Sequence, residues 1–461
     1  MNSKSGIALF LAALAAATAA VCWLMLASEI PLGVMGEWVW NRSTPPPLQR
    51  WALPALAGVV LVLVGAAGYR SLVKSGRGSL AWLVALMAAG AFHQAALVDL
   101  PGDVFGMERW PFALALKNTS GYHAIAAERH AAGVTVPRFL REYAAWIETQ
   151  DSFHVGTHPP GLFVANLALI EFFANRLELV DQLQRHSPKR WASGVAAYET
   201  QIGRLEPPAR AALAAVAALT WLAVWLAALA VYLLVRAGST PAVAYLAAAL
   251  WLAAPGPLLF LPLADSFFVL PAAAGLACFR WGLRSAWLAV PLGALFGALQ
   301  WMGMHCSLAF AVVGAAAAIL GVLTLVAAPR HELMRQLFRL LLVSIAAFAA
   351  FGALVWWNYR EHGLPLWHVW LINLRKHAGF YAAMPRSYWP WIGVNLLEFL
   401  VVLGPGAAVA WIFAAPAAAR DWRSRTLFWT AVLLVVALDL SGKNLSEAGR
   451  LWLFLLPLAV A

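Results

Sequence analysis

The chain has 461 residues, of which 62% are hydrophobic and only 11% are charged, and its mean hydropathy is +0.74. This composition excludes a soluble globular domain, because so few polar residues cannot cover a water-facing surface of this size. The net charge is +11. Lys and Arg lie mostly in short loops between apolar runs, which points to membrane orientation and anionic lipid rather than to nucleic acid.

Apolar runs near the length of a bilayer recur along the chain, and each must be helical because backbone groups in hydrocarbon find no water. The sequence therefore predicts an all-α polytopic membrane protein with about thirteen transmembrane helices. The predicted spans are 6–28, 51–68, 79–98, 159–175, 209–235, 240–263, 266–282, 286–304, 307–328, 338–357, 393–415, 426–441 and 449–461. We expect the first to be an uncleaved anchor, and the last, too short to cross, to indicate a truncated chain.

Three regions follow from this order of spans. Residues 1–78 hold two N-terminal spans, residues 79–330 form a core, and residues 331–461 hold the C-terminal spans with an outer loop at 359–392. The core contains a long outer loop at 99–158. In this loop "SGYHAIAAERHAAG" and "VPRFLREYAAWIETQ" have amphipathic helical spacing, and we expect both to lie on the membrane surface with their apolar faces down.

The distribution of Lys and Arg predicts which loops share a side of the membrane. Loops 69–79, 328–339 and 420–425 are expected in the cytoplasm together with Arg280 and Arg284, and loops 28–49, 99–158, 359–392 and 441–450 are expected outside together with Asp265.

One conflict remains in this topology. If His158 and Asp265 both lie outside, an even number of crossings must separate them, yet three apolar segments lie between them. Residues 176–190 also look cytoplasmic by their charge. We expect the proline-rich "APGPLLFLPLAD" (254–265) to be re-entrant or broken, because prolines are tolerated at membrane depth where they line a cavity.

A rigid polar elbow, "THPPGL", opens the apolar run that begins at residue 159. Pro159 and Pro160 suit a first helical turn, where the missing N–H is not needed. A helix start at a membrane interface explains the prolines. It explains neither His158 nor the sixty-residue loop in front of it.

The order "GYHAIAAERH", "VPRFL", "THPPGLFVANLALIEFF", "GRLEPPAR" and "APGPLLFLPLAD" resembles the GT-C membrane glycosyltransferases. The similar branch contains the protein O-mannosyltransferases and the lipid A aminoarabinose transferases, and the resemblance covers roughly residues 80–330. It implies that Tyr122, His158, Arg204 and Asp265 belong to a sugar site, with His158 and Asp265 among the catalytic residues. It also implies a polyprenyl-phosphate sugar as donor.

The chain departs from this family at one position. The family places an acidic pair just before the loop tyrosine, where this chain has Asn118 and Thr119. A neutral amide cannot act as a general base. Either catalysis has been lost, or another carboxylate supplies the base, and Asp99, Asp103 and Glu108 are the candidates just upstream. Asp265 is either a helix cap, a site residue, or both.

Cations are also needed to hold the departing phosphate. The segment "NLRKHAGFYAAMPRSYWPW" (373–391) combines cations with aromatic rings, and "SGKNLSEAGRLW" (441–452) adds another basic residue. An interfacial aromatic belt with snorkelling cations explains the same pattern. The predicted substrate-binding residues here are Arg375, Lys376, His377, Tyr381, Arg386 and Arg450.

Metal binding has little support in the sequence. His154 and His158 are four residues apart, but Pro159 argues against a regular helix there, so hydrogen bonding is favoured over a shared metal. A divalent metal remains possible as a cofactor. Cys22, Cys278 and Cys306 have no metal-like spacing and are expected to be packing residues.

The sequence therefore predicts a glycosyltransferase in a bacterial inner membrane, with its site facing the periplasm or exterior. It would move a sugar from the polyprenyl-phosphate donor to an extracytoplasmic acceptor, which could be a lipid, a glycan or a protein. The partners are this donor, membrane lipids and the acceptor, without nucleic acid. Two alternatives stay open: a transporter or flippase of a lipid-linked or amphipathic solute, and a catalytically silent relative.

Overall fold

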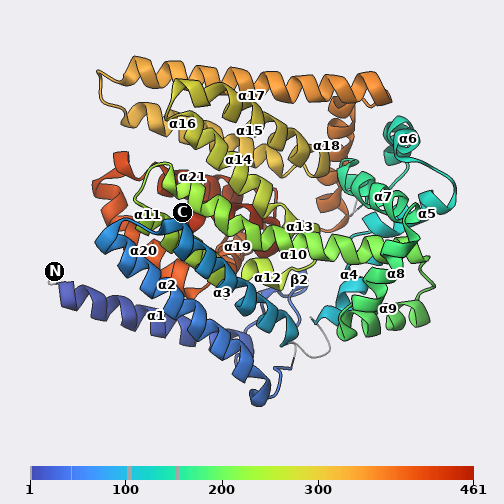
Figure 1. Ribbon diagram of the computed structural model, residues 1–461, viewed down its shortest axis with the longest axis horizontal. Coiled ribbons are helices and arrows are strands. Elements are labelled where there is room, and N and C mark those ends of the chain that lie inside the picture. The colour runs from blue at the N-terminus through green and yellow to red at the C-terminus, as the bar shows by residue number, and fades with distance from the viewer. Residues whose placement is uncertain (1–2, 43, 101–105, 152–154) are drawn as a thin grey trace.

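Long apolar helices dominate the computed structural model of the protein, as the hydropathy pattern predicts (Figure 1). The structure describes residues 3–42, 44–100, 106–151 and 155–461. The longer helices are α1 (Ser3–Leu26), α2 (Ala52–Ser75), α3 (Ser79–Asp99), α10 (Pro207–Arg236), α11 (Pro241–Ala253), α14 (Val269–Gly282), α15 (Ala286–Cys306), α16 (Phe310–Ala327), α17 (Leu333–His362), α18 (Leu366–Ala383), α19 (Tyr388–Leu403), α20 (Pro405–Arg420) and α21 (Thr426–Leu440).

The connecting segments also contain helices and one small hairpin. The helices are α4 (Trp110–Ala115), α5 (Tyr122–Ala131), α6 (Val136–Glu148), α7 (Gly161–Ala174), α8 (Leu177–His186), α9 (Lys189–Gln201), α12 (Gly256–Leu259), α13 (Ala264–Phe267), α22 (Ala448–Leu451) and α23 (Leu456–Ala459). Single 3₁₀ turns are η1 (Leu48–Trp51), η2 (Met107–Arg109), η3 (Val155–Thr157), η4 (Trp422–Ser424) and η5 (Leu453–Leu455). The strands β1 (Gly33–Val34) and β2 (Trp38–Val39) pair antiparallel, with Gly33 opposite Val39.

Eight helical segments in the described part of the chain are long and apolar enough to cross a membrane, or nine if the bent pair α19–α20 is one span. They are α1, η1 with α2, α3, α10, α11 with α12, α15, α16 and α17. Many of their large apolar side chains face outward, such as Trp287 and Phe348, each 77% exposed. The protein is therefore an integral membrane protein.

The predicted count of thirteen spans is not confirmed. The five other predicted segments form shorter or interrupted helices: α7, α14, α19 with α20, α21, and the short turns α22, η5 and α23. The segment predicted as one span at 393–415 bends by 113° between α19 and α20. Gly404 and Pro405 lie at that break, where proline interrupts the backbone bonds of a continuing helix.

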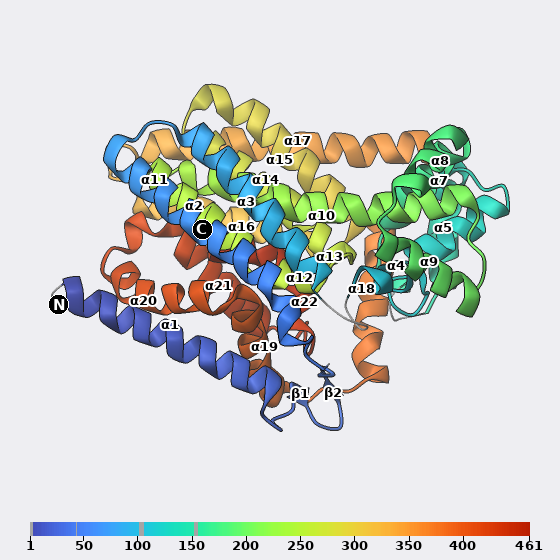
Figure 2. The ribbon, with the colours of Figure 1, turned by 60° about the horizontal axis from the view of Figure 1, so that its bottom comes forward.

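The loops lie at two ends of the helix bundle. Figures 1 and 2 show α4 to α9 gathered at one end. The turns between α2 and α3, α16 and α17, and α20 and α21, which contain the basic loops of the sequence, lie at the other end. The sequence therefore groups these three basic loops together correctly. Which end faces the cytoplasm stays a prediction.

Helix α7 bears on the topological conflict between His158 and Asp265. It has 14 residues, which span about 21 Å, whereas a hydrocarbon core is about 30 Å thick. It packs against α5, α6, α8 and the start of α10, at one end of the bundle. Residues 176–190 therefore lie at the same end as helices α4 to α6, contrary to the prediction from their charge. Between the two residues, the helical segments long enough to cross are α10 and then α11 with α12.

The proline-rich segment 254–265 is broken, as predicted, into the short helices α12 and α13. The predicted amphipathic helices α5 and α6 also form. Their apolar faces, however, do not lie on the membrane surface as expected. Ile125, Phe139 and Ile147 are at most 7% exposed and share one apolar core with α7 and α18. These faces are buried against protein rather than laid on lipid.

Candidate functional site

The proline elbow is held by two side chains from other helices. Pro160 precedes α7, so the carbonyl of His158 lies outside the helical hydrogen-bond ladder. It accepts a hydrogen bond from the Tyr143 hydroxyl of α6 at 2.7 Å and another from Asn373 Nδ2 of α18 at 3.2 Å. Asn373 also donates to the carbonyl of Gly156 at 2.9 Å. A fully buried asparagine and a buried tyrosine thus fix the elbow.

The start of α7 also lies directly against the end of α15. A Cβ added at Gly161 would lie 2.6 Å from both Cys306 Sγ and the His305 carbonyl oxygen. Only glycine allows this approach without displacing backbone. The elbow is therefore seated on the end of a membrane helix, and Cys306 is a packing residue there, as expected.

Tyr122 begins α5 and faces the elbow. Gly121 precedes it with φ +74°, a conformation that glycine adopts without strain. The Tyr122 ring meets the His158 ring edge-on, with the centroids 5.3 Å apart. Burial raises the pKa of Tyr122 well above its ordinary value, nearby Asp265 raises it further, and Arg450 opposes both. Two sequence-predicted residues thus touch, and two more lie within electrostatic reach.

Asp265 and Arg450 meet beside Tyr122, although 185 residues (450 − 265) separate them in sequence. Asp265 lies in α13, just after the broken segment, and Arg450 lies in α22. The Arg450 Nε is 3.9 Å from Asp265 Oδ2, and an Arg450 terminal nitrogen donates to Glu447 Oε2 at 3.1 Å. The Nε is buried and has no hydrogen-bond partner among the described residues.

The backbone before Arg450 is strained. Ser446 and Glu447 have φ of +96° and +55°, a region in which residues other than glycine are uncommon. Each such residue costs roughly 1–3 kcal/mol. Strain of this kind persists where surrounding contacts over-determine a conformation, and it often accompanies a functional site. Here the strained residues precede Arg450, whose guanidinium is buried.

Helix α18 connects the elbow to the loop that precedes Arg450. Asn373 of this helix binds the elbow. Two turns further along, the Tyr381 hydroxyl donates to the Lys443 carbonyl at 2.6 Å and accepts a hydrogen bond from the Leu445 N–H at 2.9 Å. His377 lies between these levels, where burial and the nearby Lys443 charge lower its pKa. The predicted aromatic segment is therefore next to the predicted site, and Tyr381 positions the loop there.

Lys376 contacts protein rather than open space. Its Nζ donates to the Glu148 carbonyl at 3.2 Å and to the Gln150 carbonyl, both at the C-terminal end of α6. A cation at this end satisfies carbonyls that the helix leaves free and complements its dipole. The phosphate-binding role predicted for Lys376 stays untested, but its contacts are those of a helix cap.

The other predicted cations lie apart from Asp265. Arg204 is exposed in the turn between α9 and α10, and Arg375 is exposed on α18. Arg386 lies near Glu37 of the β1–β2 turn. Glu37 accepts hydrogen bonds from the Ser387 N–H and from Trp391 Nε1, so this carboxylate anchors the hairpin to the start of α19.

Of the upstream carboxylates, Glu108 lies outside the cluster. Glu108 in η2 forms an ion pair with Arg190 of α9, with Oε1 and Nε 3.3 Å apart. Asp103 lies outside the described residues, as does His154. Of the carboxylates predicted as the general base, Asp265 is therefore the one that the described structure places beside Tyr122 and Arg450.

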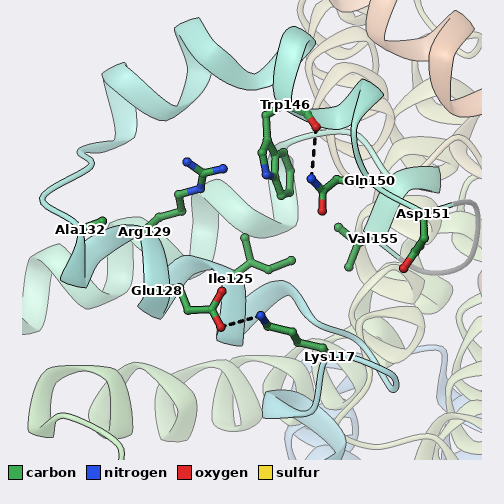
Figure 3. A pocket seen from close by; sticks show the side chains of 9 residues that line it. All are labelled: Lys117, Ile125, Glu128, Arg129, Ala132, Trp146, Gln150, Asp151 and Val155. Atoms are coloured by element: carbon green, nitrogen blue, oxygen red, sulfur yellow. Dashed lines mark hydrogen bonds and ion pairs between the residues drawn. The ribbon is translucent and has the colours of Figure 1, made fainter.

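A cavity of about 410 Å³ opens between α5 and α6 (Figure 3). Val155 of η3 lines it, three residues before His158, whereas His158, Asp265 and Arg450 do not. Within the described ranges, no three His, Cys, Asp or Glu side chains gather in a way that could hold a metal ion. A metal cofactor remains a prediction from sequence.

The sequence predicts four members of this cluster, namely Tyr122, His158, Asp265 and Arg450. It misses Tyr143 and Asn373, because a neutral hydrogen-bond donor on a helix has no distinctive spacing. Comparison with family models, with curated proteins and with solved structures finds no significant match. The resemblance to the GT-C glycosyltransferases therefore rests on the sequence motifs.

Proposed function

We propose that this protein is a membrane glycosyltransferase that moves a sugar from a polyprenyl-phosphate donor to an acceptor on the extracytoplasmic side of a bacterial plasma membrane. One observation carries the proposal. Asp265 and Arg450 meet beside Tyr122 and the His158 elbow, at the end of the bundle opposite the basic loops. A lipid-linked sugar presents its phosphate and its sugar at such a boundary, while its tail stays in hydrocarbon.

Each group has a task in a single displacement. The acceptor hydroxyl oxygen attacks the anomeric carbon, its proton passes to Asp265, and the bond between that carbon and the phosphate oxygen breaks. Arg450 faces the departing phosphate, and its buried Nε–H offers a donor with no hydrogen-bond partner among the described residues. Tyr122 and the elbow fix the position of these groups. Single displacement inverts the anomeric centre.

The test compares transfer by purified protein and by variants, using radiolabelled polyprenyl-phosphate hexose and acceptor membranes. We expect Asp265→Asn to lower the transfer rate by roughly 10²–10⁴-fold, as for loss of a general base. Arg450→Gln should lower it by roughly 10²–10³-fold, because it removes charge stabilisation from the transition state. Both variants should retain the wild-type thermal midpoint to within a few degrees.

Arg185→Gln is the matched control, because it removes one arginine charge from an exposed position on α8. It should transfer sugar at the wild-type rate. A transporter or a silent relative predicts no transfer by any of these proteins, in an assay where an established glycosyltransferase succeeds. Wild-type rates for both Asp265→Asn and Arg450→Gln would instead show that the chemistry does not depend on these two residues.

A further inference from the structure

The cavity between α5 and α6 has a mixed lining. Five polar residues and four apolar residues surround it: Lys117, Glu128, Arg129, Gln150 and Asp151, with Ile125, Ala132, Trp146 and Val155. Its volume of about 410 Å³ lies within the range of small-molecule sites, roughly 300–1,000 Å³. A lipid tail would favour a lining without this many charged groups. The ligand must therefore have both polar and apolar surface.

The charges around the cavity cancel. Lys117 and Arg129 are positive, and Glu128 and Asp151 are negative. Lys117 Nζ and Glu128 Oε1 form an ion pair at 2.6 Å, drawn in Figure 3. A phosphate site would show excess positive charge, and a cation site would show excess negative charge. A balanced lining with donors and acceptors suits a neutral polyhydroxyl compound.

The remaining groups fit a sugar ring. The Arg129 guanidinium lies 5.4 Å from the centre of the Trp146 ring, and no carboxylate in the described ranges lies within ion-pair distance of it. The Gln150 amide nitrogen donates to the Trp146 carbonyl at 3.3 Å, which leaves the amide oxygen turned towards the cavity (Figure 3). Trp146, Ile125 and Val155 offer an apolar wall to the C–H face of a pyranose.

Two elements connect this cavity to the cluster at Asp265. Helix α5 contributes Tyr122 to the cluster and Arg129 to the cavity, seven residues apart, which corresponds to about 10 Å along the helix axis. Lys376 of α18 holds the end of α6 next to Gln150. A molecule bound in the cavity therefore lies about two helical turns along α5 from Tyr122 and the Asp265 cluster.

We propose that the cavity between α5 and α6 binds a neutral sugar unit of the acceptor, so that the acceptor is a glycan. This inference rests on the proposed function. The cavity holds one sugar unit of the acceptor glycan, and the hydroxyl of a neighbouring sugar unit reaches the Asp265 cluster.

Binding tests this inference without any donor. Purified protein in lipid nanodiscs is applied to an array of neutral, acidic and phosphorylated oligosaccharides, and the apparent Kd is measured for each glycan that retains it. We expect neutral glycans to bind, and both Arg129→Gln and Gln150→Leu to weaken that binding at least tenfold. Arg141→Gln, an exposed charge on α6 outside the cavity, should bind as the wild type does.

Three results would overturn the inference: no glycan binds, only acidic or phosphorylated glycans bind, or the Arg129 and Gln150 variants bind neutral glycans as tightly as wild type. Thermal midpoints check that the variants are folded. The binding measurement is independent of sugar transfer. Its failure would therefore leave a glycosyltransferase with another acceptor, while absence of sugar transfer by the wild-type protein would remove the enzyme and leave the binding result standing.

Discussion

His123 of α5 is a buried histidine that the fold keeps neutral. Asn166 of α7 donates through Nδ2 to the Leu162 carbonyl at 2.8 Å, which turns its Oδ1 towards His123 Nδ1 at 3.1 Å. Nδ1 therefore carries the proton. The other ring nitrogen, Nε2, is buried without a hydrogen-bond partner among the described residues. Burial lowers the pKa of His123 from 6.5 to about 4, although the bond to Asn166 opposes the shift.

This pKa predicts acid sensitivity. Between pH 6.5 and about 4 the unfolded chain binds a proton at His123 that the folded protein does not. The contribution to stability is therefore complete above pH 6.5 and is lost as the pH falls towards 4. The loss amounts to at most roughly 1.4 kcal/mol per pH unit. The thermal midpoint of the detergent-purified protein should fall over this window.

The His123→Leu variant should show a smaller fall in midpoint between neutral and acid pH, because the titrating group is gone. His331→Leu, which replaces an exposed histidine at the opposite end of the bundle, should keep the wild-type fall. A His123→Leu protein with the full wild-type fall in midpoint would show that other groups cause the acid sensitivity.

At the scale of single elements, the close packing of α7 on α15 predicts a large effect of one methyl group. Gly161→Ala would place a Cβ 2.6 Å from Cys306 Sγ and from a backbone carbonyl oxygen, so one helix must shift. Overpacking of this kind costs typically about 1–3 kcal/mol. We expect a lower thermal midpoint, and slower sugar transfer because the elbow moves with α7.

Gly352→Ala is the matched control for this experiment. Gly352 lies inside α17, and an added Cβ would meet nothing within 4 Å. Alanine there should leave the midpoint unchanged or raise it slightly, because glycine is a poor helix former. Equal midpoints for Gly161→Ala and Gly352→Ala would contradict the packing described here.

Elements differ in how well the sequence predicts them. The long spans were predictable, because 20 or more apolar residues have few alternatives to a membrane helix. Helix α7 falls among the predicted spans because a short apolar helix buried in protein has the same composition as one in lipid. For α5 and α6 the spacing identifies the apolar face, but not what covers it. Lys376 is a similar case in the candidate site. A cation near aromatic rings can cap the end of a helix as well as bind a phosphate, and the sequence does not distinguish the two roles.

At the scale of the whole molecule, the arrangement of loops predicts which residues share a side of the membrane. Helices α4 to α9 lie at one end of the bundle, and the 14 residues of α7 are fewer than a membrane crossing needs. Single cysteines at Arg185 and Lys443 should therefore react with a membrane-impermeant maleimide from one side of sealed vesicles. A cysteine at Arg77 should react from the other side.

The positions themselves give the control for this labelling. Arg77 lies in the turn between α2 and α3, and all three positions are polar and lie outside the predicted spans. The native cysteines are replaced first, apart from Cys306, which lies against Gly161. Labelling of the Arg185 position from the same side as Arg77 would mean that α7 crosses the membrane after all.

The wide separation of the cluster residues along the chain has a consequence for biosynthesis. Translation delivers Tyr122, His158 and Asp265 early, and Arg450 emerges only after every helix up to α21 has been made. The nascent protein therefore inserts its carboxylate before the guanidinium that will accompany it exists. Assembly of this cluster must therefore follow the synthesis of every helix up to α21, so a nascent polypeptide that stops before α22 lacks the guanidinium even when most of its bundle is in place.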